Sequence, residues 1–123
     1  MSLGCNAQSQ DVTISEHRAT VEWQRSGEVR YETYSRAHAL HFDAIEVRGN
    51  AAPGNIPSTV KHEAGVDPEQ AFVAALSSCH TLWFLTFAGK APSEQEHRAL
   101  HHRAHEKCFI ANSVKTQVLV EPC

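Results

Sequence analysis

The sequence predicts an α+β fold in which antiparallel strands pack on a central buried helix and a second helix. Three observations predict it: short alternating segments in the first half, a long apolar stretch from Asp67 to Ala88, and a helical repeat between residues 93 and 112. A length of 123 residues fits one domain spanning residues 1–123. Residues 1–16 are polar and unpatterned, so we expect a loose N-terminal arm.

Alternation of apolar and polar side chains predicts the strands. In the first half of the chain it predicts strands at His17–Trp23, Val29–Tyr34, His38–Phe42 and Ala44–Val47, which form an antiparallel meander. Near the end of the chain the same pattern predicts a last strand over Val114–Val120.

The central helix has a clear start. Asp67 is a good N-cap, Pro68 suits the first helical position and Gln70 completes a capping box. A long loop over 49–65 precedes it, with two prolines and three glycines. Apolar residues occur on every side of the helix, so we expect it to be covered all round. The polar run at 77–80, which includes Cys79, makes the stretch too polar and too short for a confident membrane span.

A second helix is predicted from Ser93, which forms a capping box with Glu96, to about Asn112. Its apolar face repeats at spacings of three and four. The residues on that face are Leu100, Ala104, Cys108 and Ala111. Cys108 is therefore expected to face inward.

Composition limits the partners. The net charge is −3 and the pI is near 6.3, which gives no basic field for nucleic acid or an anionic membrane. No signal peptide is recognisable, so a cytoplasmic location is expected, where structural disulfides are rare. The four cysteines have no CxxC spacing; they are Cys5, Cys79, Cys108 and Cys123.

One cysteine on each helix allows redox chemistry, in which one thiolate attacks and the other resolves the product as a disulfide. Burial disfavours a thiolate, so a cation is needed nearby. Arg36 is a candidate, and Glu69, in the first turn of the central helix, could orient it through a bidentate pair. The plainer interpretation is that Cys79 and Cys108 are small core residues and that Arg36 and Glu69 are a solvated charge and a helix-dipole partner.

A rival interpretation is metal binding. His101, His105 and Cys108 have helical spacings of four and three, and His97 extends the line. No second cluster supplies further ligands, and solvated or capping histidines on a polar helix explain the pattern better.

Three blocks of sequence resemble the OsmC/Ohr family of thiol peroxidases, closest to its OsmC-like branch. They are YSRAH at 34–38, DPEQAFVAALSSCHTLWFL at 67–85 and LHHRAHEKCFIANSV at 100–114. The resemblance implies an α+β domain in an intertwined homodimer, with two sites at the subunit interface. It implies no metal and no bound cofactor.

The resemblance also implies roles for four residues. Cys79 matches the family's peroxidatic cysteine, Cys108 its resolving cysteine, Glu69 its glutamate and Arg36 its arginine. The implied function is reduction of organic hydroperoxides, with a dithiol such as dihydrolipoamide as the reductant. A non-catalytic OsmC-like dimer is a further alternative, because a fold does not guarantee an activity.

The chain departs from the family pattern in one respect. Cys79 and Cys108 are only 29 positions apart, whereas the family places a bend and further strands between these two helices. We therefore expect that a segment is missing near 85–88, either from the gene or from the sequence. On this interpretation the helix runs from Asp67 to about Leu85, and Thr86–Ala88 belong to the end of a strand.

Overall fold

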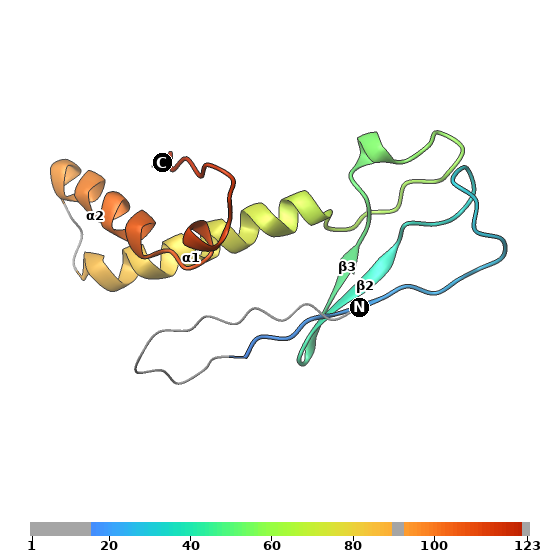
Figure 1. Ribbon diagram of the computed structural model, residues 1–123, viewed down its shortest axis with the longest axis horizontal. Coiled ribbons are helices and arrows are strands. Elements are labelled where there is room, and N and C mark those ends of the chain that lie inside the picture. Colours follow the sequence, from blue (N-terminus) through green and yellow to red (C-terminus); the bar gives the residue numbers. More distant parts are fainter. Residues whose placement is uncertain (1–15, 90–92, 122–123) are drawn as a thin grey trace. The chain divides into compact units, whose positions relative to one another are not determined.

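The computed structural model describes residues 16–89 and 93–121 (Figure 1). Its contacts divide the chain into two units, Met1–Glu69 and Gln70–Cys123, which are described separately below. Nearly all of the predicted N-terminal arm lies outside the described residues, as do Cys5 and Cys123.

The first unit contains a three-stranded antiparallel sheet with strand order β1-β2-β3. The strands are β1 (Thr20–Glu22), β2 (His38–Phe42) and β3 (Ile45–Gly49). The register places Val21 opposite Leu40 and Leu40 opposite Val47, so the apolar side chains of the three strands share one face. An antiparallel meander is confirmed for three of the four predicted strands, with β2 at its predicted bounds.

The turn between β2 and β3 and the end of β3 depend on particular residues. Phe42 pairs with Ile45 across a two-residue turn, in which Asp43 has a φ of 50°. Aspartate tolerates this left-handed conformation better than most residues do. At the other end of the hairpin, Gly49 lies against the ring of His38, and a Cβ at Gly49 would collide with that ring.

The predicted strand at Val29–Tyr34 is wrong. The carbonyl of Arg30 accepts hydrogen bonds from the backbone N–H groups of Thr33 (3.0 Å) and Tyr34 (3.1 Å), which close the chain into a turn. Alternation therefore identified residues suited to a strand but not a partner for their backbone groups.

The long loop after β3 was predicted correctly and is held at both ends. It contains one short 3-10 helix, η1 (Pro53–Asn55). The buried Asn50 donates from its side chain to the carbonyl of Glu63 at 2.7 Å, and Val66 donates from its backbone to Arg48 at 2.8 Å. These bonds bring the chain back to β3 before the central helix begins.

The central helix, α1 (Pro68–Ala88), begins with proline as predicted. It continues through Thr86, whose hydroxyl donates to the carbonyl of Leu82 at 2.7 Å. The expectation that Thr86–Ala88 belong to a strand is therefore wrong. The helix ends at Gly89, whose φ of 55° suits a residue without a Cβ.

The expectation that α1 is covered all round is also wrong for this chain by itself. No residue of α1 is buried, and Val73, Leu82 and Leu85 are 59%, 64% and 61% exposed. By length and composition alone, α1 could cross a membrane. That is weak evidence, because the core helix of a soluble protein passes the same test.

The second helix, α2 (Glu94–Lys107), starts with the predicted capping box. The hydroxyl of Ser93 accepts from the backbone N–H of Glu96 at 3.3 Å, and the Glu96 carboxylate accepts from the backbone N–H of Ser93 at 2.7 Å. The helix ends earlier than predicted, and a short 3-10 helix, η2 (Ala111–Ser113), follows it.

The predicted last strand at Val114–Val120 is wrong as well, because these residues form no strand in the structure. Among its described residues, the second unit contains helices only. A segment with strand composition has no neighbouring strand in that unit with which to pair.

The capping box gives a test of the start of α2. Replacing Ser93 by Ala removes one of its two hydrogen bonds and should lower the free energy of unfolding by about 1 kcal/mol. Denaturant unfolding measures the change, and Ser93→Asp, which keeps an acceptor, is the matched control. An unchanged unfolding midpoint for Ser93→Ala would contradict this role.

The short spacing between the cysteines gives a second test. The chain of 123 residues has a mass of 13.6 kDa, so the intact mass of protein expressed from the gene shows whether residues are absent between α1 and α2. We expect a mass of 13.6 kDa if the deletion lies in the gene itself. A mass larger by several kilodaltons would instead show that a segment is absent from the sequence.

Candidate active site

The second unit is built on an antiparallel pair of helices, in which residues late in α1 contact residues early in α2 (Figure 1). Phe84 stacks against His101 with ring centroids 4.4 Å apart and meets His97 edge-on at 5.2 Å. The guanidinium of Arg103 lies 4.2 Å from the centre of the Phe87 ring. Aromatic and cation-π contacts therefore align the two helices.

This alignment brings Cys79 and Cys108 together. Cys79 is half-buried in the middle of α1, whereas Cys108, directly after α2, is only 2% exposed. The thiol of Cys108 lies 4.0 Å from the carbonyl of Leu76, three residues before Cys79. Both cysteines are free, and Cys79 lies near enough to Cys108 to raise the pKa of its thiol.

Cys108 is the C-cap residue of α2. It does not lie within a longer helix, as was predicted. Its ψ of 112° is extended, and Asn112 stabilises the bend by donating from its side chain to the carbonyls of Glu106 and Cys108, both at 2.9 Å. Sequence reasoning missed this role of Asn112. The signal was the preference of asparagine for helix ends and turns.

The environment of Cys108 favours its protonated form. Burial raises the pKa of the Cys108 thiol, and the neighbouring Cys79 raises it further. The backbone N–H groups of Ala111 and Ile110 have the opposite, smaller net effect on that pKa. At neutral pH Cys108 is therefore a thiol, suited to react second rather than first.

Two histidines join the helices beside the thiols. Nε2 of His80 lies 2.9 Å from Nδ1 of His101, and the two rings stack at 5.2 Å with an angle of 9°. Desolvation and then the neighbouring His101 and His105 lower the pKa of His80. The pKa of His101 is lowered by desolvation and then by His97. Sequence reasoning placed His101 on a metal-binding face and assigned no role to His80.

The proposed metal ligands do not form a site. Among residues 16–89 and 93–121, no three His, Cys, Asp or Glu side chains are placed to hold a metal ion together. His101 is instead engaged by His80 and Phe84, and Cys108 by Cys79 and α1. The helical spacing of His101, His105 and Cys108 is thus used for packing.

Arg36 belongs to the first unit, where its guanidinium donates to the carbonyls of Tyr34 (2.7 Å) and Tyr31 (2.6 Å). It also lies 3.8 Å from the centre of the Tyr34 ring. Arg36 is therefore half-buried and fixed by its own segment, and is not the solvated strand-end charge of the plainer interpretation.

Glu69 lies in the first turn of α1, as predicted, and is exposed. In the part of the chain that the structure describes, its carboxylate makes no hydrogen bond or ion pair, with Arg36 or with any other residue. Its position suits a favourable interaction with the helix dipole. The pairing of Glu69 with Arg36 stays a prediction.

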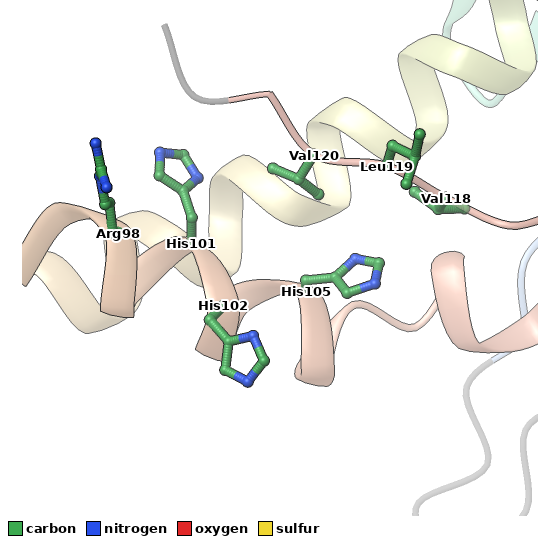
Figure 2. Close-up of a pocket in the computed structure, with 7 residues that line it drawn as sticks. All are labelled: Arg98, His101, His102, His105, Val118, Leu119 and Val120. Atoms are coloured by element: carbon green, nitrogen blue, oxygen red, sulfur yellow. The ribbon is translucent and has the colours of Figure 1, made fainter.

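A cavity of about 290 Å³ lies between α2 and residues 118–120 (Figure 2). It is lined by Arg98 and three histidines of α2 and by an apolar segment near the end of the chain: His101, His102, His105, Val118, Leu119 and Val120. Figure 2 shows that His102 points away from the apolar segment. The cavity contains no cysteine and is separate from the thiol pair.

Comparison with known proteins identifies the fold. No protein-family model and no curated protein matches the chain. The structure is similar to that of an OsmC-like protein of unknown function from Vibrio cholerae O1 biovar eltor, with a TM-score of 0.77 and 36% sequence identity. The match covers 87% of this chain and 98% of that chain. With the predicted α+β architecture and the two cysteine-bearing helices in place, we conclude that the chain belongs to the OsmC-like family.

Proposed function

We propose that the protein is a thiol-dependent peroxidase that reduces organic hydroperoxides. The observation that supports this proposal is the proximity of two free thiols, because Cys108 lies against α1 at Leu76 and Cys79 raises its pKa. Packing alone would be satisfied by two apolar side chains. A pair of reduced thiols near each other can instead store two electrons and release them as a disulfide forms.

The difference between the two thiols assigns their order of reaction. Cys79 is half-buried and therefore the more accessible to a substrate, whereas Cys108 is buried with a raised pKa. We assign Cys79 as the attacking residue and Cys108 as the resolving residue for this reason.

The reaction then has three balanced steps. The Cys79 thiolate attacks the distal peroxide oxygen, the O–O bond breaks, and the leaving alkoxide takes a proton and departs as an alcohol. The sulfur is oxidised to a sulfenic acid. Cys108 attacks that sulfur, so that an S–S bond forms and water leaves. An external dithiol reduces this disulfide and is itself oxidised to a disulfide.

The attacking thiolate needs a cation, and we assign that role to Arg36 with Glu69 behind it. Arg36 supports this assignment because its guanidinium is oriented by two carbonyls and a tyrosine ring. A guanidinium held in this way keeps its charge and loses little conformational freedom on binding an anion.

Apolar side chains beside the thiols favour an organic peroxide over hydrogen peroxide. Trp83 on α1 meets Phe109, the residue after Cys108, with ring centroids 5.5 Å apart, and Phe109 is 66% exposed. An exposed aromatic surface next to a reactive thiol stabilises a bulky apolar substrate.

We further propose that the functional form is a homodimer in the cytoplasm. Large apolar side chains are exposed along α1 and beyond α2, including Val73, Leu82, Leu85, Phe109 and Leu119. An apolar surface of this extent is typical of a surface that another chain covers. A second copy would also complete the covering of α1 that its sequence predicts.

Substitution of the cysteines tests the peroxidase. Cys79→Ser should abolish consumption of an organic hydroperoxide such as cumene hydroperoxide, because no thiolate remains to attack. Cys108→Ser should allow one turnover and leave a sulfenic acid, which dimedone traps as an adduct detectable by mass spectrometry. Cys5→Ser and Cys123→Ser are controls for the loss of a cysteine elsewhere. Full multiple turnover by the Cys79→Ser protein would refute the mechanism.

Sedimentation velocity tests the dimer. We expect a species of twice 13.6 kDa at micromolar concentration. Leu82→Glu should shift it toward monomer, because the substitution puts a charge on the exposed apolar face of α1. Lys115→Glu, which changes an exposed charge after η2, is the control. A monomer at all concentrations would contradict the proposal.

A further inference from the structure

The link between His80 and His101 depends on a single hydrogen. Two ring nitrogens 2.9 Å apart form a hydrogen bond only when one carries a proton and the other offers a lone pair. When both rings are fully protonated, both facing nitrogens carry a hydrogen, the bond is lost and two cations face each other in stacked rings. The contact therefore cannot survive full protonation of the pair.

The surroundings of the pair do not accept a further proton either. Nδ1 of His80 and Nδ1 of His105 are buried and have no hydrogen-bond partner in the described part of the chain. A proton added to Nδ1 of His80 would become a buried donor without an acceptor. His80 is thus held in its neutral form by geometry.

Among residues 16–89 and 93–121, no acidic side chain is placed to compensate for protonation of the pair. From α2, the groups around the pair are His97, Arg98 and His105, and Arg98 is only distantly paired with Glu94, at 3.9 Å. From α1 the titratable neighbour in sequence is Cys79, and Cys108 lies beside that thiol. Beyond α2, the segment that faces His101 and His105 across the cavity contributes Val118, Leu119 and Val120, which are apolar (Figure 2).

We propose that the contact between His80 and His101 is a proton-operated latch between α1 and α2, closed when the rings are neutral and released when both are protonated. Cys79 precedes His80 directly, and Cys108 follows the helix that carries His101. Release of the latch therefore separates the two thiols. The latch itself does not depend on the proposed peroxidase activity.

The direction of the pH effect follows from the proton balance. The folded protein lowers the pKa of both His80 and His101 below the ordinary 6.5, so the unfolded chain binds more protons near that pH. The stability that the latch contributes is present above pH 6.5. It is lost as the pH falls below 6.5 through the lowered pKa values.

Denaturant unfolding between pH 8 and pH 5 tests the latch. The wild-type protein should lose stability as the pH falls, and His80→Gln and His101→Gln should each lose distinctly less. His102→Gln is the matched control, because His102 is on the same helix but is exposed and pairs with Glu106, at 3.3 Å, within α2 itself. It should follow the wild type. A wild-type pH dependence in His80→Gln would overturn the proposal.

Two measurements on the wild-type protein keep the test independent of whether the variants fold. Imidazole NMR should show His80 and His101 titrating below 6.5, and titration of either ring at or above 6.5 would overturn the latch. The second is the equilibrium of the Cys79–Cys108 disulfide with glutathione, read by peptide mass spectrometry. While all thiols are protonated, this exchange neither takes up nor releases protons, so its own chemistry gives no pH dependence. Because release of the latch separates the thiols, we expect the disulfide to be less favoured at pH 5 than at pH 7. A disulfide equally favoured at both pH values would also overturn the latch.

Discussion

Contacts between the side chains of α1 and α2 are the interactions on which the rest of the second unit depends. Ala104, fully buried on α2, and Cys108, at its end, are the buried apolar residues among those described. Both are small, and the link between the helices is made instead by ring contacts and by the Cys108 thiol, which lies 4.0 Å from the carbonyl of Leu76. A larger side chain at Ala104 would have to displace its neighbours, because a fully buried position has no spare volume.

This small core explains why the chain leaves so much apolar surface uncovered. A domain of 123 residues normally buries an extensive set of Leu, Ile, Val and Phe side chains. Here Phe72, Val73 and Leu82 are exposed on α1, while an alanine and a cysteine are buried. Contacts within one chain therefore account for the pairing of the helices but not for the apolar composition of α1, which suits a helix covered on all sides.

The sequence predicted the features that local chemistry determines. Capping residues placed the starts of α1 and α2, and alternation placed β2, because these signals act within a few residues. The strand predictions at 29–34 and 114–120 were wrong for one reason. A strand also needs a neighbouring strand to pair with, and a local pattern of side chains does not reveal whether one is present. The candidate site divides in the same way: the resemblance pointed to Cys79 and Cys108, but helical periodicity could not foresee that α2 ends at Lys107 or that Asn112 fixes the bend.

The short connection between the helices bears on whether the thiol pair needs a longer chain. Phe84 contacts His97, and His80 contacts His101. Residues near the end of α1 therefore pair with residues near the start of α2, and only a few residues separate Gly89 from Ser93 in the sequence. A connection of this length allows little choice of register between antiparallel helices. The present chain thus places Cys79 near Cys108 because its short connection fixes the register of the two helices. In a chain with a longer connection, packing alone would have to set the same register. In the present chain the two thiols lie near each other without such an insertion.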